Sequence, residues 1–291
     1  MFKKIINFLT EKIIRSNSHY ENVILSIGQI QSKLNSINKI KKISDSEFKV
    51  FSQWGEDGII DYLVENLNIE NTTFIEFGVE DYEESNTKFL LLNRNWKGFV
   101  IDSSLDYINK IKNSQLYWKY SITAFQAFIT KENINQLMQL SGFKKQVGIL
   151  SIDIDGNDYW IWNEINVIEP SIVIVEYNSR LGNEKSYVVP YDSNFERKAA
   201  HYSMIYYGAS LKALIKLATQ KGYAFVCCNK AGNNAFFVKK ELLNDKVREA
   251  DINEGYVENN FRESRDNTGN LIYLKKKEEI EIIFKLPLIE V

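Results

Sequence analysis

The sequence has few cysteines, prolines and histidines, and each shortage excludes a class of structure. Its 291 residues include two cysteines, three prolines and two histidines. Cys227 and Cys228 are adjacent, and adjacent cysteines rarely bridge each other, so a disulfide framework is excluded. Three prolines exclude long proline-rich linkers. Because His19 and His201 are the only histidines, a histidine-rich zinc site is excluded as well.

Long apolar runs and an excess of one charge are also missing. The formal net charge of −2 gives no overall attraction to nucleic acid or to an acidic membrane, so we expect no nucleic-acid partner. No stretch approaches the ~20 apolar residues that span a bilayer. The basic and apolar start of the chain is interrupted by Lys12 and Arg15 and lacks a small-residue cleavage site, unlike a signal peptide. We therefore expect a cytoplasmic protein without a transmembrane segment.

Residues 1–46 predict an N-terminal helical extension. Its apolar residues alternate steps of four and three, the spacing of one helical stripe, at Val23, Ile27, Ile30, Leu34 and Ile37. We expect this stripe to pack on the chain's own domain. One alternative is a short coiled coil that joins subunits into a homo-oligomer. Another is a helix on a membrane surface, which would use Phe2, Ile5, Ile6, Phe8 and Leu9 with Lys3, Lys4 and Lys12.

Residues 47–291 predict one α/β domain with its core at 51–239. Short apolar strands are expected at 73–78, 98–102, 120–124, 147–153 and 171–176. Helical patterns separate them, which indicates a parallel sheet covered on both faces. Two further strands, 224–228 and 235–239, flank a Gly-Asn-Asn turn and predict an antiparallel pair at the sheet edge. The predicted fold is Rossmann-like: a doubly wound, mostly parallel seven-stranded sheet with a C-terminal antiparallel hairpin.

Acidic residues end four of the predicted strands. Glu76 ends the first, Asp102 the second, Asp153 the fourth and Glu176 the fifth. In an open parallel sheet, ligands bind outside the carboxyl ends of the strands. A single acid there is also a common helix cap or turn residue. Four together indicate a binding crevice lined by carboxylates.

Two motifs in this region resemble a known enzyme family. Glu76-Phe77-Gly78, then Asp102 and the acids around Asp153, on a seven-strand pattern with a late hairpin, resemble the class I S-adenosylmethionine-dependent methyltransferases. Residues 51–57, Phe-Ser-Gln-Trp-Gly-Glu-Asp, resemble the opening of the FkbM-type members, which often serve surface-glycan or secondary-metabolite pathways. The resemblance covers about residues 51–239. It departs at residues 79–82, where many such enzymes have further glycines.

The resemblance implies S-adenosylmethionine as the cofactor. The turn after the first strand would lie beside its methionine part, Asp102 would hold its ribose hydroxyls, and residues after the third strand would line its adenine. The cofactor-binding residues implied in this way are Gln53, Glu76, Gly78, Asp102, Ser103, Thr123, Ala124 and Asp153.

The chemistry of methyl transfer also needs a group that can take a proton from the acceptor. The candidates are Asp153, Asp155, Asp158, Glu176 and His201, the last in the loop that commonly covers the acceptor in this fold. Asp153, Glu176 and Asn178 are similar to the metal ligands of catechol-type O-methyltransferases. Oxygen ligands of this kind suit Mg²⁺ or Ca²⁺ rather than zinc, so Mg²⁺ is a second candidate cofactor.

We therefore expect an S-adenosylmethionine-dependent O-methyltransferase that acts on a small polar or sugar-like acceptor. One alternative is another nucleotide-using or nucleotide-sugar-using transferase on the same sheet, since fold does not fix function. Another is a non-catalytic assembly protein that interacts through its N-terminal helix. Binding competition between nucleotide ligands separates the first two, and tight cofactor binding with turnover would exclude the third.

Overall fold

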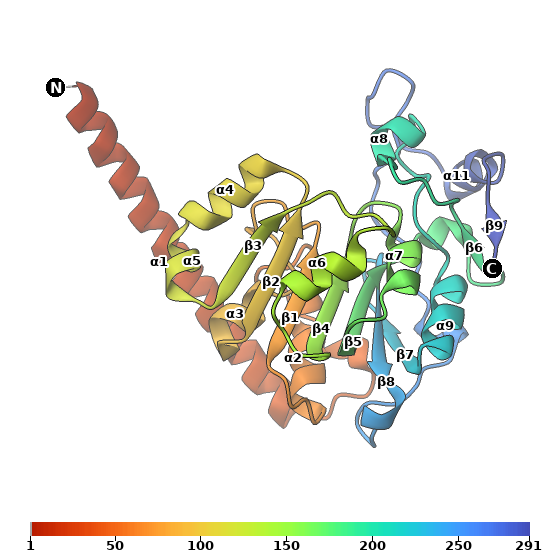
Figure 1. Ribbon diagram of the computed structural model, residues 1–291, viewed down its shortest axis with the longest axis horizontal. Helices are drawn as coiled ribbons and strands as arrows, with labels where there is room; N and C mark the ends of the chain where they lie inside the picture. Colours follow the sequence, from red (N-terminus) through yellow and green to blue (C-terminus); the bar gives the residue numbers. More distant parts are fainter. Residues whose placement is uncertain (1) are drawn as a thin grey trace.

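A seven-stranded sheet forms the centre of the protein (Figure 1). The computed structural model describes the backbone of residues 2–291 and the side chains from residue 19 onward. The strand order is β3-β2-β1-β4-β5-β8-β7. The strands are β1 Thr73–Phe77, β2 Lys97–Asp102, β3 Ile122–Gln126, β4 Gln146–Ile152, β5 Glu169–Glu176, β7 Tyr223–Cys228 and β8 Asn234–Lys239.

The first five strands are parallel to one another, and β8 is antiparallel to both of its neighbours. From β1 the chain moves outward to β3 and then returns to β4. This reversal creates a topological switch point between β1 and β4, the position at which doubly wound sheets bind ligands. The predicted Rossmann-like, mostly parallel seven-stranded sheet is confirmed.

The predicted antiparallel pair at the sheet edge is confirmed. β8 lies between β5 and β7, so β7 is the edge strand. The side chains of β8 are buried up to Val238, which an internal position explains. The turn is held by Asn229, whose Oδ1 accepts hydrogen bonds from the backbone N–H groups of Gly232, Asn233 and Asn234 at 3.0–3.1 Å.

Helices cover both faces of the sheet because alternate strand residues point to opposite sides and both sets are apolar. Phe74 and Ile149 pack with one layer, whereas Ile75 and Leu150 pack with the other. The first layer contains α2 Glu56–Asn66, α3 Lys88–Arg94 and α4 Leu105–Asn113, followed by the short α5 Gln115–Lys119. The second contains α6 Ile134–Leu140, α7 Asp158–Glu164 and α9 Leu211–Gln220 (Figure 1).

The two ends of the chain add to this core. The long helix α1, Phe2–Ile37, packs against α2 and α3, and the short turn η1, Ile43–Ser46, follows it. Elements after β5 and β8 gather at the other side of the sheet (Figure 1). They are η2 Ser179–Leu181, β6 Tyr187–Val188, α8 Arg197–Ala200, α10 Ile252–Gly255, α11 Lys276–Ile283 and β9 Ile289–Glu290. The short turn η3, Lys240–Leu242, directly follows β8, and its Leu242 packs with the layer of α2, α3 and α4. β9 pairs with β6, so the chain end is tied to the loop after β5.

The apolar stripe of α1 does not pack on the domain, so that expectation was wrong. Its five residues are 41–68% exposed, because α1 contacts the domain through its opposite face. The side chains of the proposed membrane-surface segment lie outside the described residues. Within the described part of the chain, no helix combines the length and the apolar character needed to cross a membrane.

Candidate functional site

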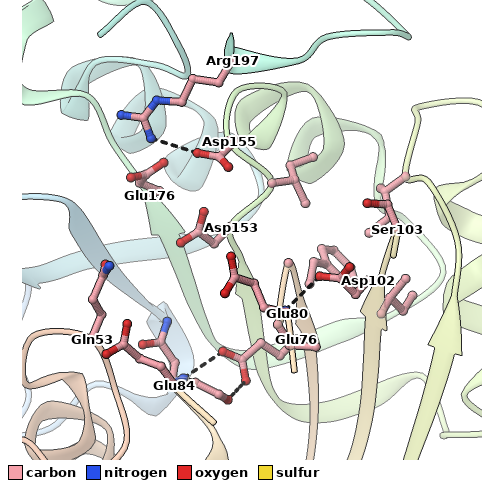
Figure 2. A pocket seen from close by; sticks show the side chains of 18 of the residues that line it. Gln53, Glu76, Glu80, Glu84, Asp102, Ser103, Asp153, Asp155, Glu176 and Arg197 are labelled. Carbon is pink, nitrogen blue, oxygen red and sulfur yellow. Dashed lines mark hydrogen bonds and ion pairs between the residues drawn. The ribbon is translucent and has the colours of Figure 1, made fainter. Parts of the chain in front are cut away.

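A cavity of about 660 Å³ opens at the carboxyl ends of the central strands (Figure 2). This volume lies within the range of about 300–1,000 Å³ that is typical of small-molecule sites. Carboxylates dominate its lining: Glu76, Glu80, Glu84, Asp102, Asp153, Asp155, Glu176 and Glu263. The basic side chains in the lining are Arg197 and Arg262. The excess of negative charge favours a cationic ligand.

Gly78 brings the turn after β1 against the turn after β4. Its φ is +66°, and a Cβ atom there would lie 1.8 Å from the carbonyl oxygen of Asp153. Only glycine fits such a contact in this backbone region. The predicted importance of Gly78 therefore has a physical cause: it sets the distance between the two halves of the cavity.

The carboxylate of Glu76 organises the loop that follows β1. It accepts hydrogen bonds from the Ser85 hydroxyl at 2.6 Å and from the backbone N–H groups of Asn86 and Thr87 at 2.9 and 3.2 Å. Burial raises its pKa above the usual range, although these donors act in the opposite direction. Glu76 thus shapes the cavity wall through the backbone that it holds.

Asp102 is held rigidly at the end of β2. Its two carboxylate oxygens accept from the N–H groups of Glu80, at 2.9 Å, and Ser104, at 2.7 Å. Each oxygen keeps a further lone pair, and the side chain lines the cavity beside Ser103. Figure 2 shows Asp102 and Ser103 on one side of the cavity, away from Glu176. Burial raises the pKa of Asp102.

The residues predicted after the third strand need correction. β3 spans Ile122–Gln126, two residues later than the predicted 120–124, because Tyr120 is the C-terminal cap of the helix α5 and its N–H donates to the carbonyl oxygen of Leu116. Thr123 and Ala124 therefore lie inside the strand and do not line the cavity. The lining here consists of residues 127–129, Ala-Phe-Ile, which follow the true strand end.

The segment before α2 is braced by the acids of the Phe51–Asp57 motif. Asp57 Oδ2 accepts from the N–H groups of residues 50, 51 and 52 at 2.7–2.8 Å. Glu56 Oε1 accepts from the side-chain amides of Asn229 and Asn234 at 2.6 and 2.9 Å. These bonds fix the segment that places Gln53 on the cavity wall (Figure 2). The two acids of the motif therefore have a structural role, which is to hold the backbone that carries Gln53.

Three acids from β4 and β5 converge across the cavity. One carboxylate oxygen from each of Asp153, Asp155 and Glu176 lies within 4.8 Å of the others. Burial, followed by repulsion from Asp155, raises the pKa of Asp153 well above its usual range. Burial, followed by repulsion from Asp153, does the same to the pKa of Glu176. Among the described residues, buried Glu176 Oε2 has no hydrogen-bond partner.

Three other predicted site residues have structural contacts instead. Asp158 accepts from the N–H groups of residues 154 and 156 at 3.0 and 2.9 Å and does not line the cavity. Asn178 Nδ2 donates to the carbonyls of residues 205 and 207 at 2.8 and 3.1 Å, and its Oδ1 accepts from the N–H of residue 180. His201 Nδ1 lies 2.6 Å from the Ser203 hydroxyl, outside the cavity lining.

These placements correct the sequence predictions. The predicted metal set of Asp153, Glu176 and Asn178 loses its amide, because Asn178 does not line the cavity. Asp155 takes its place in the cluster. Asp158 stabilises the turn before α7 rather than facing a ligand. Burial lowers the pKa of His201.

Sequence reasoning missed Arg197 and Glu263. Arg197 Nη1 lies 2.8 Å from Asp155 Oδ1, and Nη2 lies 2.6 Å from Glu263 Oε1. Its guanidinium carbon lies 3.7 Å from the centroid of the Tyr207 ring. Figure 2 shows Arg197 directed toward Asp155 beside Glu176. In the sequence, Glu196-Arg197-Lys198 has the composition of an exposed charged loop, so no local signal identified it.

Two aromatic side chains form one wall of the cavity. The rings of Trp54 and Phe261 stack with centroids 5.0 Å apart and an interplanar angle of 22°. Phe261 belongs to the segment after β8, where the sequence pattern predicted no site residue. This flat apolar wall faces a polar cavity, the combination that suits a ring-shaped polar ligand.

No family model and no curated protein matches the sequence significantly. Solved structures resemble the chain at low identity. A fibrillarin pre-rRNA processing protein from Methanococcus jannaschii has 10% identity and a TM-score of 0.40, covering 70% of this chain and 86% of its own. An S-adenosylmethionine-dependent methyltransferase from Clostridium acetobutylicum has 12% identity and a TM-score of 0.38, with 73% and 97% covered. The M. capricolum TrmK in complex with S-adenosyl-homocysteine has 10% identity and a TM-score of 0.38, with 64% and 70% covered.

These similarities do not identify an activity or a substrate. The fold assignment therefore rests on the strand order and directions of this chain, and the functional argument rests on its cavity.

Proposed function

We propose that the protein is an S-adenosylmethionine-dependent O-methyltransferase for a small polar or sugar-like acceptor. The observation that carries this proposal is the acidic cavity at the switch point of the sheet, with Asp102 at one side and Glu176 with Asp153 at the other. A nucleoside with a cationic centre would match this arrangement, with its ribose at Asp102 and its positive charge near Asp153 and Glu176. Surface-glycan or secondary-metabolite biosynthesis is the setting that the FkbM-type resemblance suggests.

The residues present fit the cofactor. Asp102 keeps free lone pairs for two ribose hydroxyls, and Ala127, Phe128 and Ile129 offer an apolar surface for the adenine. The Gly78 turn leaves its backbone open to close approach by a ligand. Glu80 and Asp153 give the negative charge that a sulfonium requires. Burial, followed by repulsion from Asp81, raises the pKa of Glu80.

When bound, the cofactor supplies an electrophilic methyl group. The chain's own task is to place an acceptor hydroxyl in line with it and to take the hydroxyl proton. We propose Glu176 Oε2 as the base, because it is buried and lacks a partner among the described residues. Burial, followed by repulsion from Asp153, raises its pKa and makes the ionised carboxylate a stronger base. Arg197, paired with Asp155, would hold the acceptor side of the cavity in place.

The same acids also fit a divalent cation. Asp153, Asp155 and Glu176 offer three oxygen ligands, the type that Mg²⁺ and Ca²⁺ prefer. A cation would have to compete with Arg197 for Asp155, since these two already form an ion pair. We propose Mg²⁺ as the ion to test, with these three residues and not Asn178 as its ligands.

The test is calorimetric titration of the purified protein with S-adenosylmethionine and S-adenosylhomocysteine, each with and without Mg²⁺. Micromolar binding of both ligands is the expected result. If neither ligand binds, both with and without Mg²⁺, the proposal is overturned and a nucleotide sugar is favoured as the ligand. If Mg²⁺ tightens the binding of these ligands to the wild type but not to Glu176→Gln, the three acids are the metal site. If Mg²⁺ does not change the affinity of the wild type, the metal proposal is overturned.

A further inference from the structure

Helix α1 exposes an unbroken row of large apolar side chains. Tyr20 precedes the stripe described above and extends it, so the row has steps of three, four, three, four and three. The six side chains are 41–68% exposed: Tyr20, Val23, Ile27, Ile30, Leu34 and Ile37. An apolar row of this length on one helix needs a partner, because isolated exposed apolar residues are common but contiguous ones mark interaction sites.

The opposite face of α1 holds the helix on the domain. Glu21 forms a 3.1 Å ion pair with the buried Lys88 of α3. Gly28 lies so close to the domain that a Cβ atom there would be 2.5 Å from Val50. Asn35 Nδ2 donates to the carbonyl of Ser46 at 2.7 Å. The docking face also includes the partly buried Ile24 and Leu25. The exposed apolar row lies on the other side of the helix and takes no part in this contact.

The spacing matches a heptad repeat, in which positions a and d form the seam between helices. With Tyr20, Ile27 and Leu34 at a, the d positions are Val23, Ile30 and Ile37. The register continues toward the N-terminus through Phe2, Ile6, Leu9 and Ile13, with Ser16 as the only polar seam residue. The pattern thus spans five heptads of the sequence, more than the three or four that indicate a coiled coil.

We propose that α1 pairs with α1 of a second copy of this chain in a parallel coiled coil. Knobs-into-holes packing needs a partner with the same 3.5-residue period, and an identical helix supplies it. In a parallel pair each g position faces the e position of the next heptad. Lys33 at g would then face Asn38, so residues 19–37 of two identical helices meet without like-charge repulsion.

The size of the seam supports the same occupant. At about 25 cal/mol per Å², the transfer free energy of a large aliphatic side chain corresponds to about 60–120 Å² of buried surface. Six such residues supply about 400–700 Å² per helix, which reaches the lower end of the about 600–1,000 Å² per partner of a stable interface.

A membrane surface suits residues 19–37 of α1 less well than a second helix does. Helices that lie on membranes carry many lysines and arginines on their polar face. Residues 19–37 contain one lysine, Lys33, and one acid, Glu21. Their polar face is also occupied, because it contacts the domain. In Figure 1 the backbone of α1 extends past the edge of the domain, which leaves room for a second helix along it.

The first experiment is to measure the mass of the full chain in solution by light scattering and sedimentation at 1–100 µM. The expected mass is that of a dimer, twice the 33.9 kDa of one chain. The variant Ile27→Glu/Ile30→Glu/Leu34→Glu should be a folded monomer, as judged by a single cooperative unfolding transition in urea. Leu140→Glu, which replaces an exposed leucine elsewhere (52%), is the matched control and should keep the wild-type mass.

A second measurement identifies the occupant and its direction. Ile30→Cys should form an interchain disulfide under mild oxidation, whereas Gln29→Cys, on a neighbouring position outside the seam, should not. The native cysteines are buried and should not interfere. A wild-type monomer at 100 µM, or an oligomer that persists in the triple variant, would overturn the proposal. So would a monomer that binds vesicles of phosphatidylcholine and phosphatidylserine in a seam-dependent way. These outcomes are independent of whether S-adenosylmethionine binds.

Discussion

The two halves of the cavity use the same residue type in different ways. In the half formed by β1 and β2, the carboxylates of Glu76 and Asp102 accept hydrogen bonds from backbone N–H groups. In the half formed by β4 and β5, Glu176 has an oxygen without a partner among the described residues, and Asp155 pairs with Arg197. Carboxylates that accept hydrogen bonds from the backbone form a rigid pocket. Buried carboxylates with few hydrogen-bond donors have raised pKa values, which are typical of groups that transfer protons. We therefore assign binding to the first half and proton transfer to the second.

The largest effect is expected where the two halves meet. Gly78→Ala should destabilise the protein by about 4 kcal/mol, because the new Cβ would collide with a carbonyl oxygen and the residue keeps a positive φ. Gly142→Ala is the matched control, since Gly142 has φ +67° with open space around it. It should cost only about 1 kcal/mol. Urea unfolding measures both, and equal losses would show that the two turns are not in tight contact.

The segment that places Gln53 should make stability depend on pH. Burial raises the pKa of Asp57 from 3.8 to about 6, so the folded state binds this proton more tightly than the unfolded state. Its contribution to stability is therefore present below about pH 4 and is lost as the pH rises through about 6, a change of up to about 3 kcal/mol. Unfolding of the wild type and Asp57→Asn, followed from pH 4 to pH 7, tests this. A constant difference between them would mean that the hydrogen bonds to Asp57 offset its burial.

The proton-transfer half should affect turnover more than binding. Glu176→Gln keeps the size of the side chain but removes the base, so kcat should fall by about 100-fold, or ~2.7 kcal/mol, with any acceptor that the wild type methylates. The Kd for S-adenosylmethionine should stay within about twofold. Glu184→Gln, at an exposed glutamate, should behave as the wild type. A variant that loses cofactor affinity and keeps its kcat would reverse the assignment of the two halves.

The binding half should show the opposite pattern. Asp102→Ala should weaken S-adenosylmethionine binding by at least about tenfold, or ~1.4 kcal/mol, because the grip on the ribose is lost. Asp102→Asn keeps one acceptor oxygen, so its Kd for S-adenosylmethionine should lie between those of the wild type and Asp102→Ala. Asp106→Ala removes a nearby exposed acid and should leave Kd unchanged. Calorimetry distinguishes these cases, and full affinity in Asp102→Ala would remove the proposed cofactor position.

Local patterns in the sequence determined the architecture and several of the residues that line the cavity. Apolar strands between helices were enough to predict the parallel sheet, because strands buried on both faces lack polar alternation. The same patterns placed Gly78, Asp102, Asp153 and Glu176 at one edge, since parallel strands end on the same side. They could not fix the end of β3, because the aromatic residues before it suit either a strand or the helix that they form.

Only the tertiary structure decided which acids face the cavity and what completes it. Asp158 and Asn178 have the residue types of ligands, but they contact neighbouring backbone groups and do not line the cavity. Arg197, Phe261 and Glu263 come from segments with no local signal, and long-range packing brings them to the site. The direction of the α1 stripe was decided in the same way. Its spacing predicts an apolar face but not a partner, whereas contacts with Lys88 and Val50 show which face the domain already occupies.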